Sequence, residues 1–492
     1  MKKVFIPAIT ICLALCIAAV SMGAYVYKDR DNVVYKELSH FGDYSKLDGI
    51  EVKTRSTLDG RLIWENTVSM GENPKTVSDY HFHVKQQREN YPRSYYGIGM
   101  NPSMIFQISR DRENSRLADY FPKAAKKFAE IWDSIGPGEE KTFNVPLKDV
   151  MAFYPFGNVS DVPGLYSIEH ALFMLENGDI GSNDDEIDFL LFMQEHFKIP
   201  VLENDIVEYT IEKDDMGFEG SIGISGPRGK ETFDAVSPTA VTDDALYFIF
   251  DAHTTKGNLV DLSNLSYGYG IYKIPIGEGE LGKYTNYKET SLFIERDPDD
   301  EPLDLVSDGE NLLLAYEREG KTFIDIIDIE NKKLKDTLEL IDNVYYVSLK
   351  SCDGFVVMDI SLNPSDGENV WNLKDRRMGV LEKKGDSYFI SFIADRFNEE
   401  MKDDLPWSDC RYAYDGTRLV SVSELRREVY APNRKEHLTY QSPDIFVKVY
   451  EKDGPVFVGE YVSSLTTGFT EGNEYRFNVR NFYPEIEVAI NK

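Results

Sequence analysis

The chain has 492 residues and a formal net charge of −31 at pH 7. This excess of negative charge excludes a general nucleic-acid binder and a binder of anionic membrane surfaces, because both partners are polyanions. A chain of this length forms more than one ordinary domain or one large repeat architecture. Its aromatic content of 13%, with 30 Tyr and 28 Phe, favours strands and predicts a mainly β fold.

The N-terminus carries a long apolar run. Residues 4–26 contain no charged side chain and follow Lys2 and Lys3. A helix of this length reaches about 34 Å, enough to cross a hydrocarbon core of ~30 Å. We therefore predict a signal anchor and transmembrane helix over residues 1–27, with the cell membrane as its partner through residues 4–26. The lysines favour a single-pass topology with the N-terminus inside and the bulk of the chain extracytoplasmic.

Two alternatives to an uncleaved anchor remain open. The small residues Ser21, Gly23 and Ala24 would suit a cleavage site after a secretory signal. Cys16 would suit a lipid anchor, although Leu15 before it is bulky where such signals prefer a small residue.

Residues 28–234 predict a mixed α+β, membrane-proximal region. Alternating residues flank Asp59-Gly60 and predict a hairpin over Glu51–Met70. Apolar residues at helical spacing predict a helix over Tyr120–Ile135, ended by Gly136-Pro137-Gly138. Two shorter helices, at Ser167–Glu176 and Glu186–Phe197, and a hairpin over residues 206–224 complete this region.

Residues 235–492 contain a weak repeat. An acidic or Asp-Gly turn precedes an apolar strand at four places: Asp243-Asp244, Asp308-Gly309, Asp353-Gly354 and Asp415-Gly416. Further strand patterns follow each turn, at an interval close to that of four-stranded propeller blades with loop insertions. We predict a degenerate β-propeller-like region, with stacked β-sandwiches as the main alternative.

The layout resembles an uncharacterised family of single-pass membrane-anchored, extracytoplasmic propeller-like proteins of Gram-positive bacteria. The segments that carry the resemblance are the N-terminal anchor, Gly42–Gly49, Phe197–Glu203, Asp243–Phe250 and Tyr269–Pro275. The resemblance implies a location and an architecture, and it supplies no activity and no catalytic residues.

Several local patterns suggest chemistry only weakly. His81 and His83 share a strand face but lack a third metal ligand, which favours a surface or core pair. The acidic link at residues 177–186 lacks the EF-hand order of a calcium loop. Gly277 to Gly282 matches GxGxxG, but two glutamates and a non-helical continuation predict a turn between strands. The acidic run Asp297 to Glu301 favours an exposed loop over a metal site.

Two further features leave alternatives open. Tyr91, Tyr95 and Tyr96 surround two glycines and could stack on sugar rings, although packing is the commoner role of such a group. Cys352 and Cys410, the only cysteines beyond the apolar run, are consistent with one disulfide or with two free thiols.

The sequence predicts no assembled catalytic motif, so the catalytic residues are unknown, and it predicts no cofactor and no metal site. We expect an acidic, membrane-tethered recognition or sensory scaffold that binds a ligand or a membrane or cell-wall protein or glycan, with no nucleic-acid partner. The alternative is an exported hydrolase with a carboxylate or Ser/His site in a propeller cleft.

Overall fold

The computed structural model divides the chain into two compact units, one made of Met1–Asn90 and Gly354–Lys492 and the other of Tyr91–Asp353. The structure describes residues 17, 33–58, 62–83, 98–100, 122–154, 156–158, 192, 193, 195–213, 220–228, 231–233, 237–279, 282–363, 375–396, 410–431, 436–465 and 482–491. The domain boundaries predicted at 27/28 and 234/235 divide the chain into consecutive segments, whereas the first unit combines two separate segments. These boundaries stay predictions.

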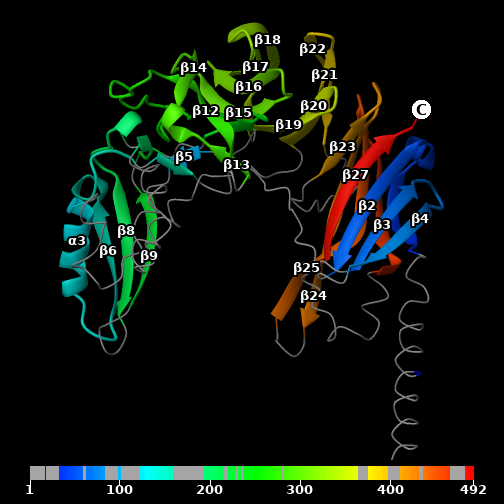
Figure 1. The fold of residues 1–492 in the computed structure, drawn as a ribbon, viewed down its shortest axis with the longest axis horizontal. Helices are drawn as coiled ribbons and strands as arrows, with labels where there is room; N and C mark the ends of the chain where they lie inside the picture. Colours follow the sequence, from blue (N-terminus) through cyan, green and yellow to red (C-terminus); the bar gives the residue numbers. More distant parts are fainter. Residues whose placement is uncertain are drawn as a thin grey trace, which may run out of the picture. The chain divides into compact units, whose positions relative to one another are not determined.

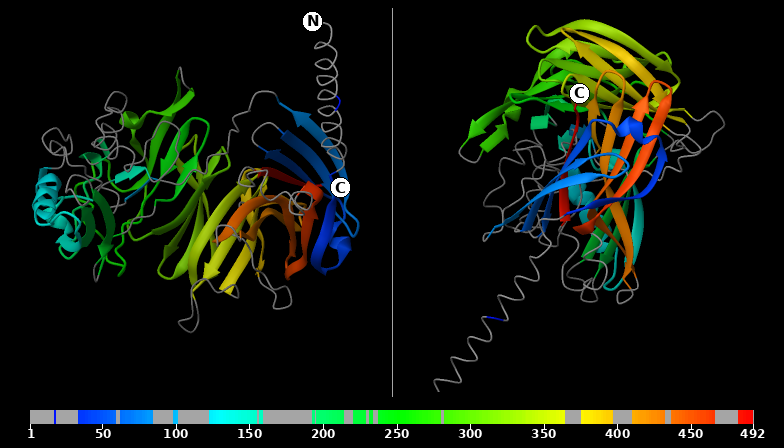
Figure 2. Two further views of the ribbon diagram at one scale, coloured as in Figure 1. Left: turned by 90° about the horizontal axis from the view of Figure 1, so that it is seen from below. Right: turned by 90° about the vertical axis from the view of Figure 1, so that its right-hand side faces the viewer.

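Both ends of the chain contribute strands to the first unit. One sheet has the order β1-β26-β25-β24-β23 and a second has the order β27-β2-β3-β4. Figures 1 and 2 show the blue N-terminal strands beside the orange and red C-terminal strands. The strands are β1 (Tyr35–Gly42), β2 (Ile50–Leu58), β3 (Leu62–Ser69), β4 (Lys75–Phe82), β23 (Arg411–Tyr414), β24 (Leu419–Ala431), β25 (Glu436–Glu451), β26 (Gly454–Ser463) and β27 (Phe482–Ile490).

The core of the first unit joins these two sheets. Val52 and Trp64 from one sheet belong to the same buried cluster as Val422, Val447 and Phe457 from the other. Alternate residues of each strand point to one face, so each sheet supplies one apolar face to this core. The unit also contains the meander β20 (Phe355–Leu362), β21 (Arg376–Lys384) and β22 (Ser387–Asp395), joined in antiparallel register.

The described residues of the second unit include several small antiparallel sheets. These are β5-β7, β6-β8-β9, a sheet of β10 to β14, and β15-β16-β17-β18. The elements are β5 (Ile98–Met100), α3 (Pro122–Asp133), β6 (Glu140–Pro146), β7 (Phe156–Asn158), β8 (Ile206–Lys213), β9 (Gly220–Arg228), β10 (Thr239–Val241), β11 (Ala245–Phe248), β12 (Gly270–Gly279), β13 (Gly282–Thr285), β14 (Ser291–Glu295), β15 (Glu301–Ser307), β16 (Asn311–Arg318), β17 (Lys321–Asp328), β18 (Lys333–Asp342) and β19 (Val344–Cys352). Short 3-10 turns occur at Tyr44–Leu47, Leu147–Asp149 and Tyr287–Glu289.

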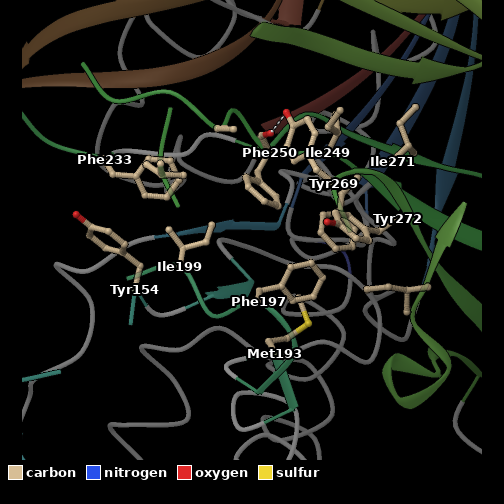
Figure 3. Packing of buried hydrophobic residues seen from close by; sticks show 14 of the residues in the cluster. Tyr154, Met193, Phe197, Ile199, Phe233, Ile249, Phe250, Tyr269, Ile271 and Tyr272 are labelled. Atoms are coloured by element: carbon tan, nitrogen blue, oxygen red, sulfur yellow. Dashed lines mark hydrogen bonds between the residues drawn. The ribbon is translucent and has the colours of Figure 1, made fainter. Parts of the chain in front are cut away.

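Aromatic side chains fill the core of the second unit. Figure 3 shows Phe197, Phe250 and Tyr272 packed together; the Phe197 and Tyr272 rings are 4.9 Å apart, edge to face. Such a geometry suits the quadrupoles of the two rings. The hydroxyl of Tyr269 is buried but donates a 2.7 Å hydrogen bond to the carbonyl oxygen of Phe250, so its burial is compensated.

The Asp-Gly repeat marks real hairpins. Each predicted turn precedes the second strand of a meander: β11, β16, β20 and β24. Gly309, Gly354 and Gly416 have positive φ, which a residue without Cβ adopts at little cost. Asp308 Oδ1 also accepts hydrogen bonds from the backbone N–H groups of Glu310 and Asn311. Four-stranded antiparallel meanders of this kind are typical of propeller blades, and the mainly β prediction is confirmed.

The transmembrane part of the predicted fold class is contradicted. Within the ranges given above, no helix is long and apolar enough to span a membrane. The prediction rested only on the length and apolarity of the run from residue 4 to residue 26, of which the structure describes only Ile17. The predicted single-pass location, with an extracytoplasmic bulk, is contradicted with it.

The predicted α+β character of residues 28–234 also needs correction. The helix predicted at Tyr120–Ile135 is present as α3, with Ile131 and Trp132 buried, and it is the one complete α-helix that the described ranges contain. The hairpins predicted at residues 51–70 and 206–224 are present as β2-β3 and β8-β9. The helix predicted at residues 167–176 lies outside the described residues, and only residues 192, 193, 195 and 196 of the second are seen as helical. Strands therefore make up most of the described secondary structure of this region, and α3 is its one complete α-helix among the described residues.

The pairing of the chain ends can be tested at Gly42, where φ is +97° and an added Cβ would collide with the carbonyl oxygen of Val456 on β26. We expect Gly42→Ala to destabilise the first unit by roughly 2–3 kcal/mol, because strain and overlap add. Thermal unfolding followed by circular dichroism measures the loss. Gly71→Ala is the control, since nothing lies within 4 Å of its added Cβ. Equal melting temperatures for the two variants would contradict the β1-β26 pairing.

Candidate functional site

A pocket of about 470 Å³ lies over the sheet β15-β16-β17-β18 in the second unit. Charged, aromatic and apolar side chains line it: Glu295, Arg296, Asp297, Asp300, Tyr316, Arg318, Phe323, Asp325, Leu334 and Thr337. Such a mixture of fixed polar groups and apolar surface is typical of a ligand pocket. We call it the Arg296 pocket.

The register of three strands assembles the Arg296 pocket. Glu301 at the start of β15 pairs with Glu317 near the end of β16, which brings residues 296–300 beside Tyr316 and Arg318. On the next strand pair, Tyr316 lies opposite Phe323. The pocket residues are therefore close in space because the hairpins place them there, although 42 positions separate Glu295 from Thr337.

Four charged side chains form a continuous ion-pair network at the base of the pocket. Arg296 donates from Nη1 to Asp325 Oδ2 at 2.5 Å and from Nη2 to Asp300 Oδ2 at 3.0 Å. Arg318 donates to the other oxygen of Asp300, Oδ1, at 2.6 Å from Nε and 2.5 Å from Nη2. Both aspartates and Arg296 are almost fully buried, whereas the Arg318 side chain is 44% exposed.

Neighbouring side chains hold this network in place. Thr337 donates to Asp325 Oδ1 at 2.6 Å, and the Tyr316 hydroxyl donates to the same oxygen at 3.4 Å. The Arg296 and Arg318 guanidinium carbons lie 4.9 Å and 5.5 Å from the Tyr316 ring centre, within cation–π range. The guanidinium groups are therefore fixed before any ligand arrives.

Burial and pairing act in opposite directions on these groups. Burial raises the pKa of Asp300, and the two arginines oppose that rise. Burial disfavours the charge on Arg296, but Asp325 and Asp300 outweigh it, so its pKa is raised. The arginines stay protonated in any case, so the pocket keeps fixed donors over the whole physiological range.

A second group of titratable side chains lies in the same unit. Asp251 Oδ1 and His253 Nδ1 are 2.7 Å apart. Burial raises the pKa of Glu301, and the charges of Asp251 and Glu317 add to the rise. A carboxyl group with a raised pKa beside an Asp-His pair is a combination that acid–base chemistry can use.

The first unit contains a buried charged cluster of its own. Asp359 Oδ2 accepts hydrogen bonds from Arg376 Nη2, at 2.8 Å, and from Arg396 Nη1. Lys448 on β25 is only 2% exposed, and its Nζ lies 5.5 Å from the Phe446 ring centre. Burial lowers the pKa of Lys448 to about 6, and the charge of Arg396 acts in the same direction.

The structure agrees with some of the predictions made for candidate site residues and contradicts others. Of the acidic run, Asp297 and Asp299 are exposed as expected, but the exposed-loop prediction is wrong for Asp300, which is buried because two arginines pair with it. Residues 277–279 lie in strand β12 and Gly282 begins its partner β13, so the predicted turn does not extend over residues 277–279. His81 is exposed and 3.4 Å from Asp79.

The remaining candidate residues from the sequence either form no metal site or disulfide in the structure or lie outside the described residues. In the described part of the chain, no group of three or more His, Cys, Asp or Glu side chains could hold a metal ion. The acidic link at 177–186, which lacks the order of a calcium loop, and the tyrosines at 91, 95 and 96 lie outside the described residues. Cys352 and Cys410 do not form a disulfide.

Sequence analysis missed Arg296, Arg318, Tyr316 and Asp325. One signal was available: Arg296 adjoins the densest acidic run in the distal half, and an arginine beside clustered carboxylates is a candidate for burial as an ion pair. The partner Asp325 sits within the apolar strand pattern of β17, where a charged residue on the core face calls for a counter-charge.

Comparisons with known proteins show only a distant likeness in fold. No family model and no curated protein matches the chain. A chain in the structure of Saccharomyces cerevisiae Dbp5 bound to Nup159 and Gle1 is 10% identical, with a TM-score of 0.22, and the match covers 59% of this chain and 62% of that one. The β-propeller domain of the Pyrococcus furiosus trilobed protease is 9% identical, with a TM-score of 0.19 and coverage of 51% and 74%.

A third similar structure, Trypanosoma rangeli sialidase with the inhibitor DANA, is 10% identical, with a TM-score of 0.24 and coverage of 53% and 50%. The chain thus spans less than two thirds of the length of several structures that it matches. These neighbours include enzymes and non-enzymes, and they show no specific function and no membership of the Gram-positive family that the sequence resembles.

The buried amine of Lys448 predicts a pH dependence of stability. Its pKa is lower in the folded chain than in the unfolded chain, so the unfolded chain binds more protons and stability falls as pH drops from about 10 to about 6. We expect Lys448→Met to remove this loss and to stabilise the first unit by roughly 4 kcal/mol at pH 7, with little gain near pH 10. Urea unfolding at both pH values measures the difference. Lys452→Met, in an exposed turn of the same unit, is the control, and equal gains in the two variants would contradict the burial of a neutral amine.

Proposed function

We propose that this protein is a ligand-recognition module and that the Arg296 pocket is its binding site. One observation carries the proposal: a pocket of about 470 Å³ has two guanidinium groups locked at its base by almost fully buried aspartates. Buried ion pairs stabilise a fold little, and well-packed apolar residues often replace them with a gain in stability. Their presence at a pocket is therefore better explained by recognition than by folding.

The geometry also suits binding without a large rearrangement. Arg318 is fixed through two nitrogens by Asp300 and is still 44% exposed, so it presents a rigid donor edge to a ligand. Groups held in place before binding lose little conformational entropy when the ligand arrives. A protein partner or a glycan would be captured by this face.

The proposal predicts that binding depends on Arg318. We expect ligands found by saturation-transfer NMR in a mixed library of small peptides, sugars and organic acids to lose their signal in Arg318→Ala. This substitution removes an exposed donor and leaves the pairs of Arg296 intact. Lys321→Ala, an exposed cation of the same sheet that does not line the pocket, is the control. A library whose hits are all indifferent to Arg318→Ala would contradict the proposal.

A hydrolase is the second candidate function, and the Asp251–His253 pair beside Glu301 favours it. We expect no turnover of chromogenic esters, peptides or glycosides by the wild-type chain, because the recognition function requires none. Sustained turnover that disappears in Glu301→Gln and persists in Lys321→Ala would favour the hydrolase function over the recognition function.

A further inference from the structure

We infer that the Arg296 pocket binds a neutral carbohydrate, through the vicinal hydroxyl groups and the apolar face of a sugar ring. The inference rests on the proposed recognition function and adds the chemical class of the ligand. Three properties of the pocket lead to it: the balance of its charges, the mixture of its donors and acceptors, and its apolar wall.

The charges exclude acidic ligands. Two arginines line the pocket together with four carboxylates, those of Glu295, Asp297, Asp300 and Asp325. The surrounding chain has a formal net charge of −31. A polyanion such as a polyphosphate or a polyuronate would therefore be repelled on approach.

The charges also disfavour a simple cation at the centre. Arg296 and Arg318 occupy the base of the pocket and are held there by Asp300. An ammonium group entering beside them would meet two fixed positive charges at short range. A neutral ligand is repelled neither by the carboxylates nor by the arginines.

Hydroxyl groups match the remaining hydrogen-bonding capacity. The contacts of Arg318 with Asp300 use Nε and Nη2, which leaves Nη1 to donate to a ligand oxygen. Glu295 and Asp297 at the rim have exposed carboxylates that accept hydrogen bonds. A hydroxyl group donates and accepts at once, so adjacent hydroxyls of one ring can satisfy the arginine and the carboxylates together.

An apolar wall completes the match. Phe323 lines the pocket and is only partly buried, and Leu334 on β18 is 48% exposed although it is apolar. The C–H face of a pyranose ring is apolar and packs on such surfaces while its hydroxyl edge stays hydrogen-bonded. In this proposal, the exposed Leu334 packs against the apolar face of the sugar ring.

The test compares hexasaccharides that differ in charge. The probes are maltohexaose, cellohexaose and mannohexaose as neutral ligands, a galacturonic-acid hexamer as the acidic one and a glucosamine hexamer as the cationic one, all titrated calorimetrically into the full chain. We expect at least one neutral hexamer to bind at least tenfold more tightly than both charged hexamers.

Variants tie this binding to the pocket. We expect Arg318→Lys, which keeps the charge but loses the planar fork, to weaken the neutral hexamer roughly tenfold, and Leu334→Ala to weaken it about threefold to tenfold. Lys321→Ala and Leu259→Ala are the matched controls, because both residues are exposed in the same unit and neither lines the pocket.

The outcomes separate the two proposals. Tighter binding of a charged hexamer, or Arg318-dependent binding of peptides without binding of any neutral hexamer, would overturn the carbohydrate inference and leave the recognition function standing. Absence of Arg318-dependent binding by every hexamer and peptide would overturn both. A neutral hexamer that binds equally to wild type and to Arg318→Lys would also overturn the carbohydrate inference.

Discussion

The Asp-Gly turn between the first two strands of a meander is the constraint on which the candidate site depends. Asp308 fixes the turn through hydrogen bonds to two backbone N–H groups, and Gly309 adopts the positive φ that the turn needs. The length and geometry of a hairpin turn set its register, and a shift of one residue would move every side chain to the other face. The turn and the register shift between Pro302 and Asp304 on β15 together place residues 296–301 beside Tyr316 and Arg318.

The strand register also determines which charged side chains are buried. Once the register is set, Asp300 and Asp325 face a pocket base from which water is largely excluded, and each must find a cationic partner. Arg296 supplies that partner to both aspartates. Removing Arg296 would leave Asp325 buried without a cationic partner, which costs far more than the intact network contributes. The site is thus tied to the fold without being needed for its stability.

Features that depend on residues close together in the sequence were predictable, and features that depend on residues far apart in the sequence were not. The hairpins at Asp308-Gly309 and Asp415-Gly416, and the helix α3, were predictable because turn residues and local periodicity encode them within a few positions. The pairings β1-β26 and β2-β27 were not, since residues some 430 positions apart carry no shared local pattern. The transmembrane prediction is contradicted in the described residues because apolar length was the only evidence for it, and the α+β prediction overstated the helical content of a region with one complete described helix.

The pocket shows why the site itself was out of reach from sequence. Its acidic half was visible as the run from Asp297 to Glu301, but an acidic run is usually solvated, and only the arginines reveal that Asp300 is buried. The exposed fraction of the arginine side chains is 8% at Arg296 and 44% at Arg318, so the base of the pocket is buried at Arg296 and accessible to solvent at Arg318. In the proposed recognition function, the ion pairs fix the direction of the donors, and the exposed side of Arg318 contacts the ligand. This difference in exposure is created by three-dimensional packing, and no local sequence pattern encodes it, so the pocket was not predictable from the sequence.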